Sequence, residues 1–276
     1  MAIELTYRGN TSIPVEVEGI TPDAMAGRSA SEISHSEIYC GNRKLPLGEL
    51  FAVSGHADDG VMRWEGDLSG VHRIGARMKA GTIHIAGSAG RHVGSEMQAG
   101  EIVVEGDAGD WLGGEMHGGS IRVEGSAGHL VGAAYRGSPR GMTGGTILIR
   151  GSAGNEIGHT MRRGLIAVGG QAGDLAGFSM RAGSILLFGA SGIRHGAGMR
   201  RGTIALFGEP SVGLLPGFRF ACRYRPEILA LVFAQLRQQQ FPVSDDVLGA
   251  QFDLYHGDLI EGGRGEILRR AAGHSE

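Results

Sequence analysis

The sequence predicts an all-β protein whose central part is a right-handed parallel β-helix, a single-stranded solenoid of about seven 19-residue coils. Three observations support this fold class. Glycine fills 51 of 276 positions, a motif containing Gly and Met returns at a nearly constant spacing, and a short run of alternating aliphatic residues precedes one glycine of each motif. Alternation with period two is typical of a strand with one buried face.

The composition excludes several other classes of protein. Apolar residues make up 41% of the chain, unlike a disordered Gly-rich tract, and 8 prolines without a Gly-x-y period argue against collagen. No window of about 20 residues is free of charge and glycine, as a membrane-spanning helix requires. The net charge of −3 gives no general attraction to nucleic acid or membrane. Because no signal peptide is visible and two cysteines cannot form a disulfide framework, we expect a cytoplasmic protein.

The repeat is aligned on the glycine that ends each aliphatic run. The steps between these glycines are 21, 19, 19, 26, 19, 19 and 19 residues, and the 26-residue step contains an insertion at about Ala133 to Arg140. Nineteen residues are too few for a helix pair or a propeller blade but suit one turn of a β-solenoid. The aligned glycines are Gly66, Gly87, Gly106, Gly125, Gly151, Gly170, Gly189 and Gly208.

Inward-facing residues are expected to form ladders along the solenoid, because equivalent positions in neighbouring coils lie about 4.8 Å apart. One ladder contains Ile83, Ile102, Ile121, Ile147, Ile166, Ile185 and Ile204, and the Met of each unit forms another. The glycines are expected at corners that need a positive φ or a close approach of two coils. Parallel crossovers are almost always right-handed, which predicts the hand.

The ends of the solenoid need caps, because they expose open strand edges. Residues 1–60 are predicted as an N-terminal β cap with strand-like runs at 3–7 and 13–17, followed by the Gly-rich β-helix at 61–217. Residues 218–276 form the predicted C-terminal helical cap. Its helix, at about 226–240, begins with a proline and keeps helical apolar spacing, and we expect it to dock against the last coil.

A row of arginines is expected on the outside of the last three coils. Arg162, Arg181 and Arg200 each follow the Met of their unit, with Arg163 and Arg201 beside them. One interpretation is a solvated basic stripe. The other is a surface that binds an anion or a carboxylate-rich partner through charge-assisted hydrogen bonds.

An apolar strip is also expected on the outer sheet face. It consists of Leu148, Leu186, Phe188 and Phe207. Contiguous apolar surface usually marks an interface, so we predict that these residues contact a partner subunit. Coverage by the C-terminal segment of the same chain is the alternative.

No pattern in the chain predicts catalysis or metal binding. The 11 histidines make no His-x-His pair or His-Glu-x-x-His motif, and the Gly-Ser-Ala-Gly turns lack the Gly-Lys-Ser/Thr of a phosphate loop. Cys40 and Cys222 have no evident base nearby, and His195 takes an inward apolar position where a buried histidine is expected. We therefore expect no catalytic residue and no metal site in this chain.

The repeat Gly-x-x-Gly-x-x-x-Gly-x-x-Met-x-x-Gly resembles the C subunit of formylmethanofuran dehydrogenase and of its bacterial relative, the formyltransferase/hydrolase complex. Two segments outside the repeat strengthen the resemblance, which covers nearly the whole chain. They are Leu47-Gly-Glu-Leu-Phe-Ala-Val-Ser-Gly55 and Tyr255-His-Gly-Asp-Leu-Ile-Glu-Gly-Gly-Arg-Gly-Glu-Ile-Leu268. A shorter version of the repeat is similar to the C-terminal β-helix of the glutamate synthase large subunit.

The resemblance implies a non-catalytic scaffold subunit that binds no cofactor alone. The complex would move a formyl group between tetrahydromethanopterin, a methanofuran-type cofactor and formate. The implied partners are a D-like formyltransferase subunit, an A-like amidohydrolase subunit that holds the metals, and a B-like subunit. The arginine row would then meet an acidic subunit surface or the glutamate-bearing tail of the cofactor.

Two alternatives remain within this resemblance. The chain could be the C subunit of a molybdenum or tungsten formylmethanofuran dehydrogenase, or a stand-alone scaffold similar to the glutamate synthase β-helix. The arginine-rich, lysine-poor composition favours the bacterial formyltransferase/hydrolase.

Overall fold

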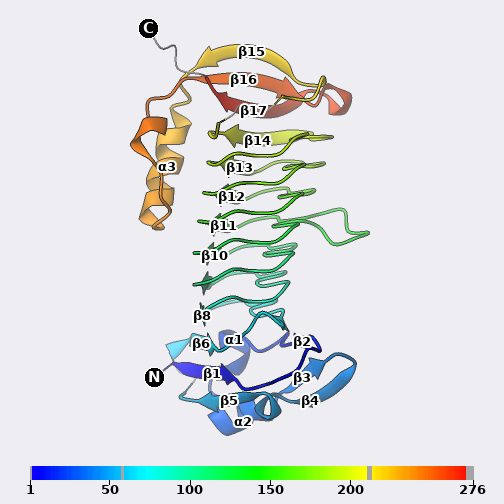
Figure 1. Ribbon diagram of the computed structural model, residues 1–276, viewed down its shortest axis with the longest axis vertical. Coiled ribbons are helices and arrows are strands. Elements are labelled where there is room, and N and C mark those ends of the chain that lie inside the picture. Colours follow the sequence, from blue (N-terminus) through cyan, green and yellow to red (C-terminus); the bar gives the residue numbers. More distant parts are fainter. Residues whose placement is uncertain (1, 57–58, 210–212, 272–276) are drawn as a thin grey trace.

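The computed structural model describes residues 2–56, 59–209 and 213–271. The protein is mostly β, with one sheet of 13 strands and a second of 4 strands. Figure 1 shows an elongated molecule in which strands are stacked along the long axis. None of the helices within the described ranges is long and apolar enough to cross a lipid bilayer.

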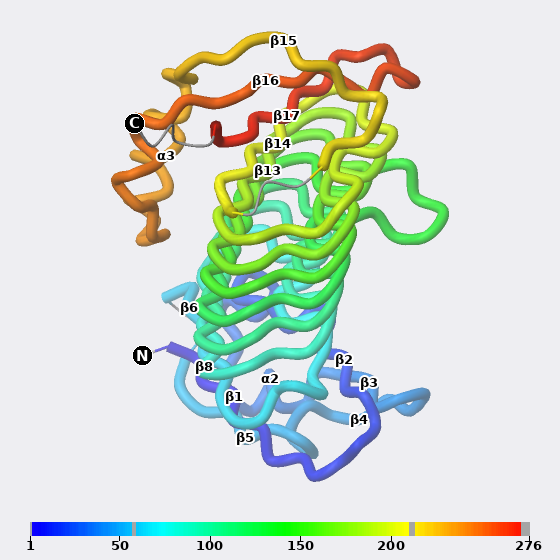
Figure 2. Tube along the Cα trace, turned by 45° about the horizontal axis from the view of Figure 1, so that its top comes forward, coloured from blue at the N-terminus to red at the C-terminus, as the bar shows by residue number. Residues whose placement is uncertain are grey.

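The centre of the molecule is a stack of parallel strands, each one unit further along the chain than the last. Figure 2 shows the trace winding through successive turns that lie directly above one another. Each of these strands pairs in parallel with the next. They are β6 (Val61–Glu65), β8 (Thr82–Ala86), β9 (Glu101–Val104), β10 (Ser120–Val123), β11 (Thr146–Ile149), β12 (Leu165–Val168), β13 (Ser184–Leu187) and β14 (Arg201–Leu206).

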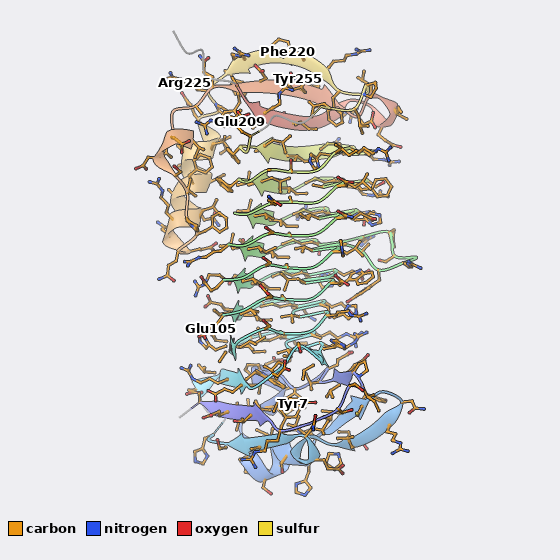
Figure 3. The ribbon with its side chains drawn as sticks, viewed as in Figure 1. Tyr7, Glu105, Glu209, Phe220, Arg225 and Tyr255 are labelled. Atoms are coloured by element: carbon orange, nitrogen blue, oxygen red, sulfur yellow. The ribbon has the colours of Figure 1, made fainter. Side chains whose placement is uncertain are left out.

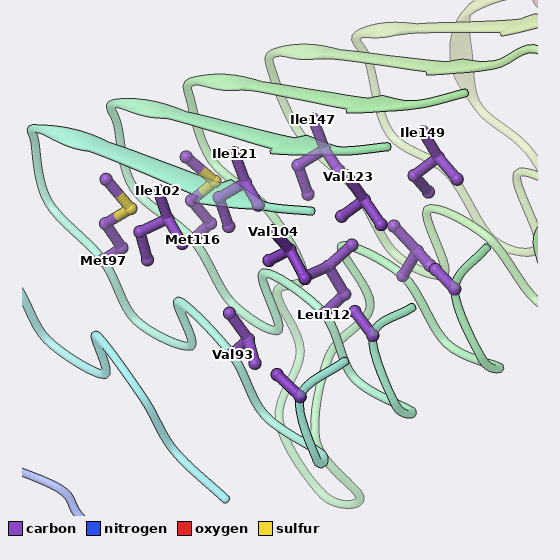
Figure 4. Packing of buried hydrophobic residues seen from close by; sticks show 14 of the residues in the cluster. Val93, Met97, Ile102, Val104, Leu112, Met116, Ile121, Val123, Ile147 and Ile149 are labelled. Carbon is purple, nitrogen blue, oxygen red and sulfur yellow. The ribbon is translucent and has the colours of Figure 1, made fainter. Parts of the chain in front are cut away.

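The predicted aliphatic ladder is confirmed. Ile102 pairs with Ile121, Ile121 with Ile147 and Ile147 with Ile166, and each of these side chains is fully buried. Figure 4 shows the isoleucines, the valines two positions further on and the methionines packed together inside the stack. The interior of each coil is therefore filled by the same few aliphatic positions.

A glycine before each strand is required by both conformation and space. Gly145 has φ +93°, and a Cβ there would lie 2.7 Å from the Met116 methyl carbon and 2.7 Å from the Gly119 carbonyl oxygen of the coil below. Such contacts are closer than real Cβ atoms tolerate, and a positive φ disfavours residues with a side chain. The Met of one coil thus fills the space left by the glycine of the next.

The Gly-Ser-Ala-Gly turns form a corner held by side chains. The Ser126 hydroxyl oxygen accepts a hydrogen bond from the Ser152 backbone N–H at 3.0 Å, and the Ser152 hydroxyl accepts one from Gln171 at 3.0 Å. One coil therefore satisfies the backbone donors of the next, as buried or half-buried N–H groups require. The Ser residues of these turns therefore bind backbone N–H groups of the next coil, and no phosphate ligand is needed to explain their positions.

The N-terminal end is closed by further strands and short helices. β1 pairs in parallel with β6 and antiparallel with β5, whereas β2 pairs with β3 and with β7. The expected strand at 3–7 is confirmed, but only two residues of 13–17 are a strand. The elements are β1 (Ile3–Tyr7), β2 (Val15–Glu16), α1 (Pro22–Met25), α2 (Ala30–Ser34), β3 (Glu37–Cys40), β4 (Arg43–Pro46), the 3₁₀ turn η1 (Leu47–Glu49), β5 (Phe51–Ser54) and β7 (Val71–His72).

The C-terminal end differs from the predicted helical cap. Three strands extend the stack, because β17 (Arg264–Arg270) pairs in parallel with β14, and β16 (Phe252–Gly257) and β15 (Arg219–Tyr224) follow antiparallel. Helix α3 (Ile228–Gln238) lies within the predicted range but runs beside the sheet (Figure 1). The helix packs against the last coil as predicted, with the Phe233 and Phe207 ring centroids 5.6 Å apart, but it lies on the side of the stack, and strands rather than the helix cover its end. Two 3₁₀ turns, η3 (Asp245–Val247) and η4 (Leu259–Glu261), complete this end, and residues 272–276 of the predicted cap lie outside the described residues.

The large sheet is parallel in its centre and antiparallel at both ends, and it does not close on itself. The all-β class is thus confirmed, whereas the right-handed parallel β-helix stays a prediction.

The last coil carries His195 where earlier coils carry an aliphatic residue. Its side chain is 3% exposed, its Nδ1 accepts the Ala176 N–H at 3.3 Å, and its Nε2 lies 3.0 Å from the Ser191 hydroxyl. Burial lowers the pKa of His195 to about 4, because the charged imidazolium would lose its solvation.

The glycine requirement predicts a position-dependent cost of adding one methyl group. Gly145→Ala should lower the free energy of unfolding by about 2 kcal/mol, because the added Cβ meets both a positive φ and the Met116 methyl. Gly70→Ala is the matched control, since a Cβ there has no atom within 4 Å. Thermal and denaturant unfolding followed by circular dichroism compares the two variants, and equal stabilities would show that the fold does not require a glycine at position 145.

His195 predicts an acid-dependent loss of stability. Between pH 6.5 and about 4 the unfolded chain binds a proton at this residue and the folded chain does not. The contribution of neutral His195 to the free energy of unfolding is therefore fully present above pH 6.5. Below that pH it falls by about 1.4 kcal/mol per pH unit. His195→Leu should make unfolding less steep in pH across that window, and urea unfolding at several pH values measures the slopes. Parallel curves for the two proteins would show that His195 does not titrate in this way.

Candidate functional site

The arginine row lies in register across the last coils. The backbone N–H groups of Arg162, Arg181 and Arg200 donate to the carbonyls of Met142, Met161 and Met180, each 2.8 Å away. Every arginine therefore stands one coil above the previous one, as the spacing predicts. Like charges at this separation repel, so the row is stable only where solvent or a counter-charge lies against it.

Arg162 is a half-buried member of the row. Burial lowers the pKa of Arg162, and the nearby cations Arg140 and Arg181 lower it further. Its Nε atom is buried and has no hydrogen-bond partner among the described residues. Arg140 comes from the insertion after β10, so the insertion adds a cation to the row that its sequence position did not predict.

A cavity of about 390 Å³ lies where the row meets the C-terminal strands. It is lined by Arg181, Arg200, Arg201, Arg264 and the turn Glu261–Gly262. The Arg200 Nε donates to Glu261 at 2.7 Å, which leaves the other three guanidinium groups without a carboxylate partner in the described part of the chain. Several guanidinium groups facing one carboxylate form a surface suited to a further carboxylate or another planar anion.

The structure brings together some of the predicted arginines and not others. Arg181, Arg200 and Arg201 line the cavity, whereas Arg162 and Arg163 belong to the coil below Arg181 and do not line it. Arg264 was not predicted. It pairs with Arg201 because Arg264-Gly-Glu-Ile repeats the pattern of Arg201-Gly-Thr-Ile after a long interruption.

The apolar strip is covered by the chain itself. Leu148, Leu186 and Phe207 are 2%, 2% and 3% exposed, and Phe188 is half-buried. The covering side chains are Leu229, Phe233 and Leu236 of α3, together with Phe241 and Phe252. The prediction that Leu148, Leu186, Phe188 and Phe207 contact a partner subunit is therefore wrong, and coverage by the C-terminal segment is correct. The physical reason is that α3 carries a matching apolar face at helical spacing.

An aromatic cluster beside the insertion was not predicted. The Tyr135 hydroxyl lies 3.1 Å from His92 Nδ1, and the rings of His92 and Trp111 stack with centroids 5.5 Å apart. Burial lowers the pKa of His92 to about 4 and raises the pKa of Tyr135. A cavity of about 420 Å³ next to Trp111 and Tyr135 is also lined by Arg136, Glu156 and His159. Because the insertion breaks the repeat, no periodic signal relates Tyr135 to His92.

Side chains that could ligate a metal are dispersed over the molecule. Within residues 2–56, 59–209 and 213–271, no three His, Cys, Asp or Glu side chains lie close enough together to hold a metal ion.

Comparisons with known proteins give local matches along the sequence and a match to a solved structure along nearly the whole chain. No family model matches the chain. The C subunit of molybdenum-containing formylmethanofuran dehydrogenase 1 from Methanosarcina barkeri is 44% identical over 85 residues, which are 29% of this chain and 28% of that protein. The C subunit of tungsten-containing formylmethanofuran dehydrogenase 2 from Methanothermobacter marburgensis is 40% identical over 95 residues, 33% of this chain and 35% of that protein. The chain thus spans about a third or less of the length of these curated relatives.

The match to a solved structure is much longer. A chain in the X-ray structure of the formyltransferase/hydrolase complex (FhcABCD) from Methylorubrum extorquens, in complex with methylofuran, is 33% identical with a TM-score of 0.89. The alignment covers 98% of this chain and 100% of that chain. Because the likeness extends over both chains, this protein belongs to the family formed by the C subunit of formylmethanofuran dehydrogenase and its counterpart in the formyltransferase/hydrolase complex.

Proposed function

We propose that this chain is the non-catalytic scaffold subunit of a cytoplasmic formyltransferase/hydrolase complex. The complex would move a formyl group between tetrahydromethanopterin, a methanofuran-type cofactor and formate. The observation that carries this proposal is the 33% identity to a chain of the complex from M. extorquens over 98% of this protein.

The scaffold role rests on how the chain uses its interior. The stack is filled by aliphatic ladders such as Ile102, Ile121 and Ile147, and its corners are held by Ser hydroxyls that bond backbone groups. These features favour a rigid body that holds other chains in place. We propose that the stack is a right-handed parallel β-helix at 61–217, with caps at 1–60 and 218–276.

The proposed partners are a D-like formyltransferase subunit, an A-like amidohydrolase subunit and a B-like subunit. These partner chains would bind the metals and catalyse the reactions. A second candidate, the C subunit of a molybdenum or tungsten formylmethanofuran dehydrogenase, is supported by the local identities of 44% and 40%.

Isolation of the native complex tests the proposal. An affinity tag on this chain should co-purify formyltransferase and amidohydrolase chains, identified by mass spectrometry. A complex that contains molybdenum or tungsten by elemental analysis would support the second candidate. A chain that elutes alone from its native source would contradict both.

The arginine row has a proposed role within this complex. Arg162, Arg163, Arg181, Arg200 and Arg201 would bind either the glutamate-bearing tail of the methanofuran-type cofactor or an acidic surface of a partner subunit. The cavity supports this role, because Arg181, Arg201 and Arg264 have no carboxylate partner among the described residues. Carboxylates bind arginine through paired, charge-assisted hydrogen bonds.

The triple variant Arg162→Gln, Arg181→Gln, Arg200→Gln should bind cofactor or partner subunits at least about tenfold more weakly, since each lost charged hydrogen bond costs about 1.5–3 kcal/mol. The matched control replaces three exposed arginines of the N-terminal half, Arg28, Arg43 and Arg63, by Gln and changes the net charge equally. Cofactor content and complex mass are measured for both variants. Equal content and mass would show that the row is only a solvated stripe.

A further inference from the structure

The large sheet ends at β15 with an unpaired edge. β15 hydrogen-bonds only to β16, and in Figure 1 no strand lies beyond it. No backbone group of Arg219–Tyr224 bonds to any described residue other than those of β16. Each outward N–H and C=O can therefore pair with a strand of another chain, as exposed edges do.

Both faces of β15 are also open. All six residues are exposed, with Phe220 at 58% and Tyr224 at 37% (Figure 3 labels Phe220). Of the ten large apolar side chains that are exposed in the described residues, eight lie between Ile193 and Ile260. Apolar exposure is thus concentrated at the C-terminal end, where contact with another protein would remove it from water.

A hollow of about 310 Å³ lies next to the C-terminal end of β15, where Arg225 follows the strand. Its walls are mixed, because Leu229, Val247 and Phe252 are apolar whereas Arg225 and Glu227 are charged. A hollow of this size accepts one large apolar side chain. Side chains buried in such pockets contribute much of the affinity of an interface.

The charges beside β15 indicate which kind of strand can pair with it. Arg223 is neutralised by Asp253, with Nε to Oδ1 at 2.6 Å, whereas Arg219 and Arg225 have no carboxylate partner in the described residues. Two copies of β15 pairing antiparallel would bring together four arginines without a carboxylate partner, Arg219 and Arg225 of each copy, because Arg219–Arg225 contains no acidic residue. Like charges across a strand pair are destabilising, which disfavours a second copy of this chain.

We propose that β15 is extended by a strand of a partner subunit that carries carboxylates opposite Arg219 and Arg225 and places one large apolar side chain in the hollow. The inference rests on the proposed function, because the partner is another subunit of the same complex. It assigns the edge of β15, two strands from the β17 that carries Arg264 of the arginine cavity, as a docking site.

Cys222 gives a direct readout, because it is exposed on β15 and the chain has only one other cysteine, Cys40 on β3. In a Cys40→Ser variant, the rate at which Cys222 reacts with a maleimide is compared between the free chain and the purified complex. Docking of the partner strand should slow the reaction at least about tenfold, since the partner's side chains beside β15 then shield the Cys222 thiol. The half-buried Cys40, measured in a Cys222→Ser variant, is the control at the opposite end and should react at similar rates in both states.

Hydrogen–deuterium exchange separates strand addition from simple coverage. The outward amides of Arg219–Tyr224 should become protected in the complex, whereas a partner that only covers the side chains would leave their exchange unchanged and would overturn the proposal.

Arg219→Glu with Arg225→Glu should weaken assembly about tenfold, and Arg28→Glu with Arg43→Glu should not. An unchanged Cys222 rate in an intact complex would overturn this inference alone. A homodimer joined through β15 would also overturn it, and absence of any complex would overturn the proposed function as well.

Discussion

Register between neighbouring coils is the constraint on which the rest of the structure depends. Parallel strands hold equivalent residues at the spacing of the backbone hydrogen bonds, so a side chain suited to one coil must suit the coils above and below it. Ile121 packs between Ile102 and Ile147 for this reason, and the Met116 methyl group occupies the space that Gly145 leaves open. A change in one coil is therefore felt by its neighbours.

The same register builds the exterior as well. Once Met142, Met161 and Met180 lie above one another, the arginines bonded to their carbonyls must form a column. The corner serines form a second column that satisfies backbone donors. The distinctive surfaces of the molecule are consequently columns along the stack and its two ends, because a repeating coil places equivalent side chains in line.

The sequence was sufficient for features that depend on the repeat and insufficient for features that depend on its interruptions. The ladder through Ile102 and Ile147 and the column of Arg162 and Arg181 were predictable, since both follow from a constant period. Which chain covers Leu186 depends on how α3 packs, and a single amphipathic pattern does not say which surface it meets. The Gly and Ile positions of β17 match those of β14 and could have indicated that the two strands pair. Because residues 209–263 between them lack the period, the spacing alone did not predict this pairing.

Because the interior of each coil packs only against the coils on either side, the number of coils can change without loss of that internal packing. Adding or removing one 19-residue unit would change the distance between the N-terminal strands and the C-terminal edge by about 4.8 Å. In the proposed scaffold role, the number of turns would set the distance between chains bound at the two ends of the stack.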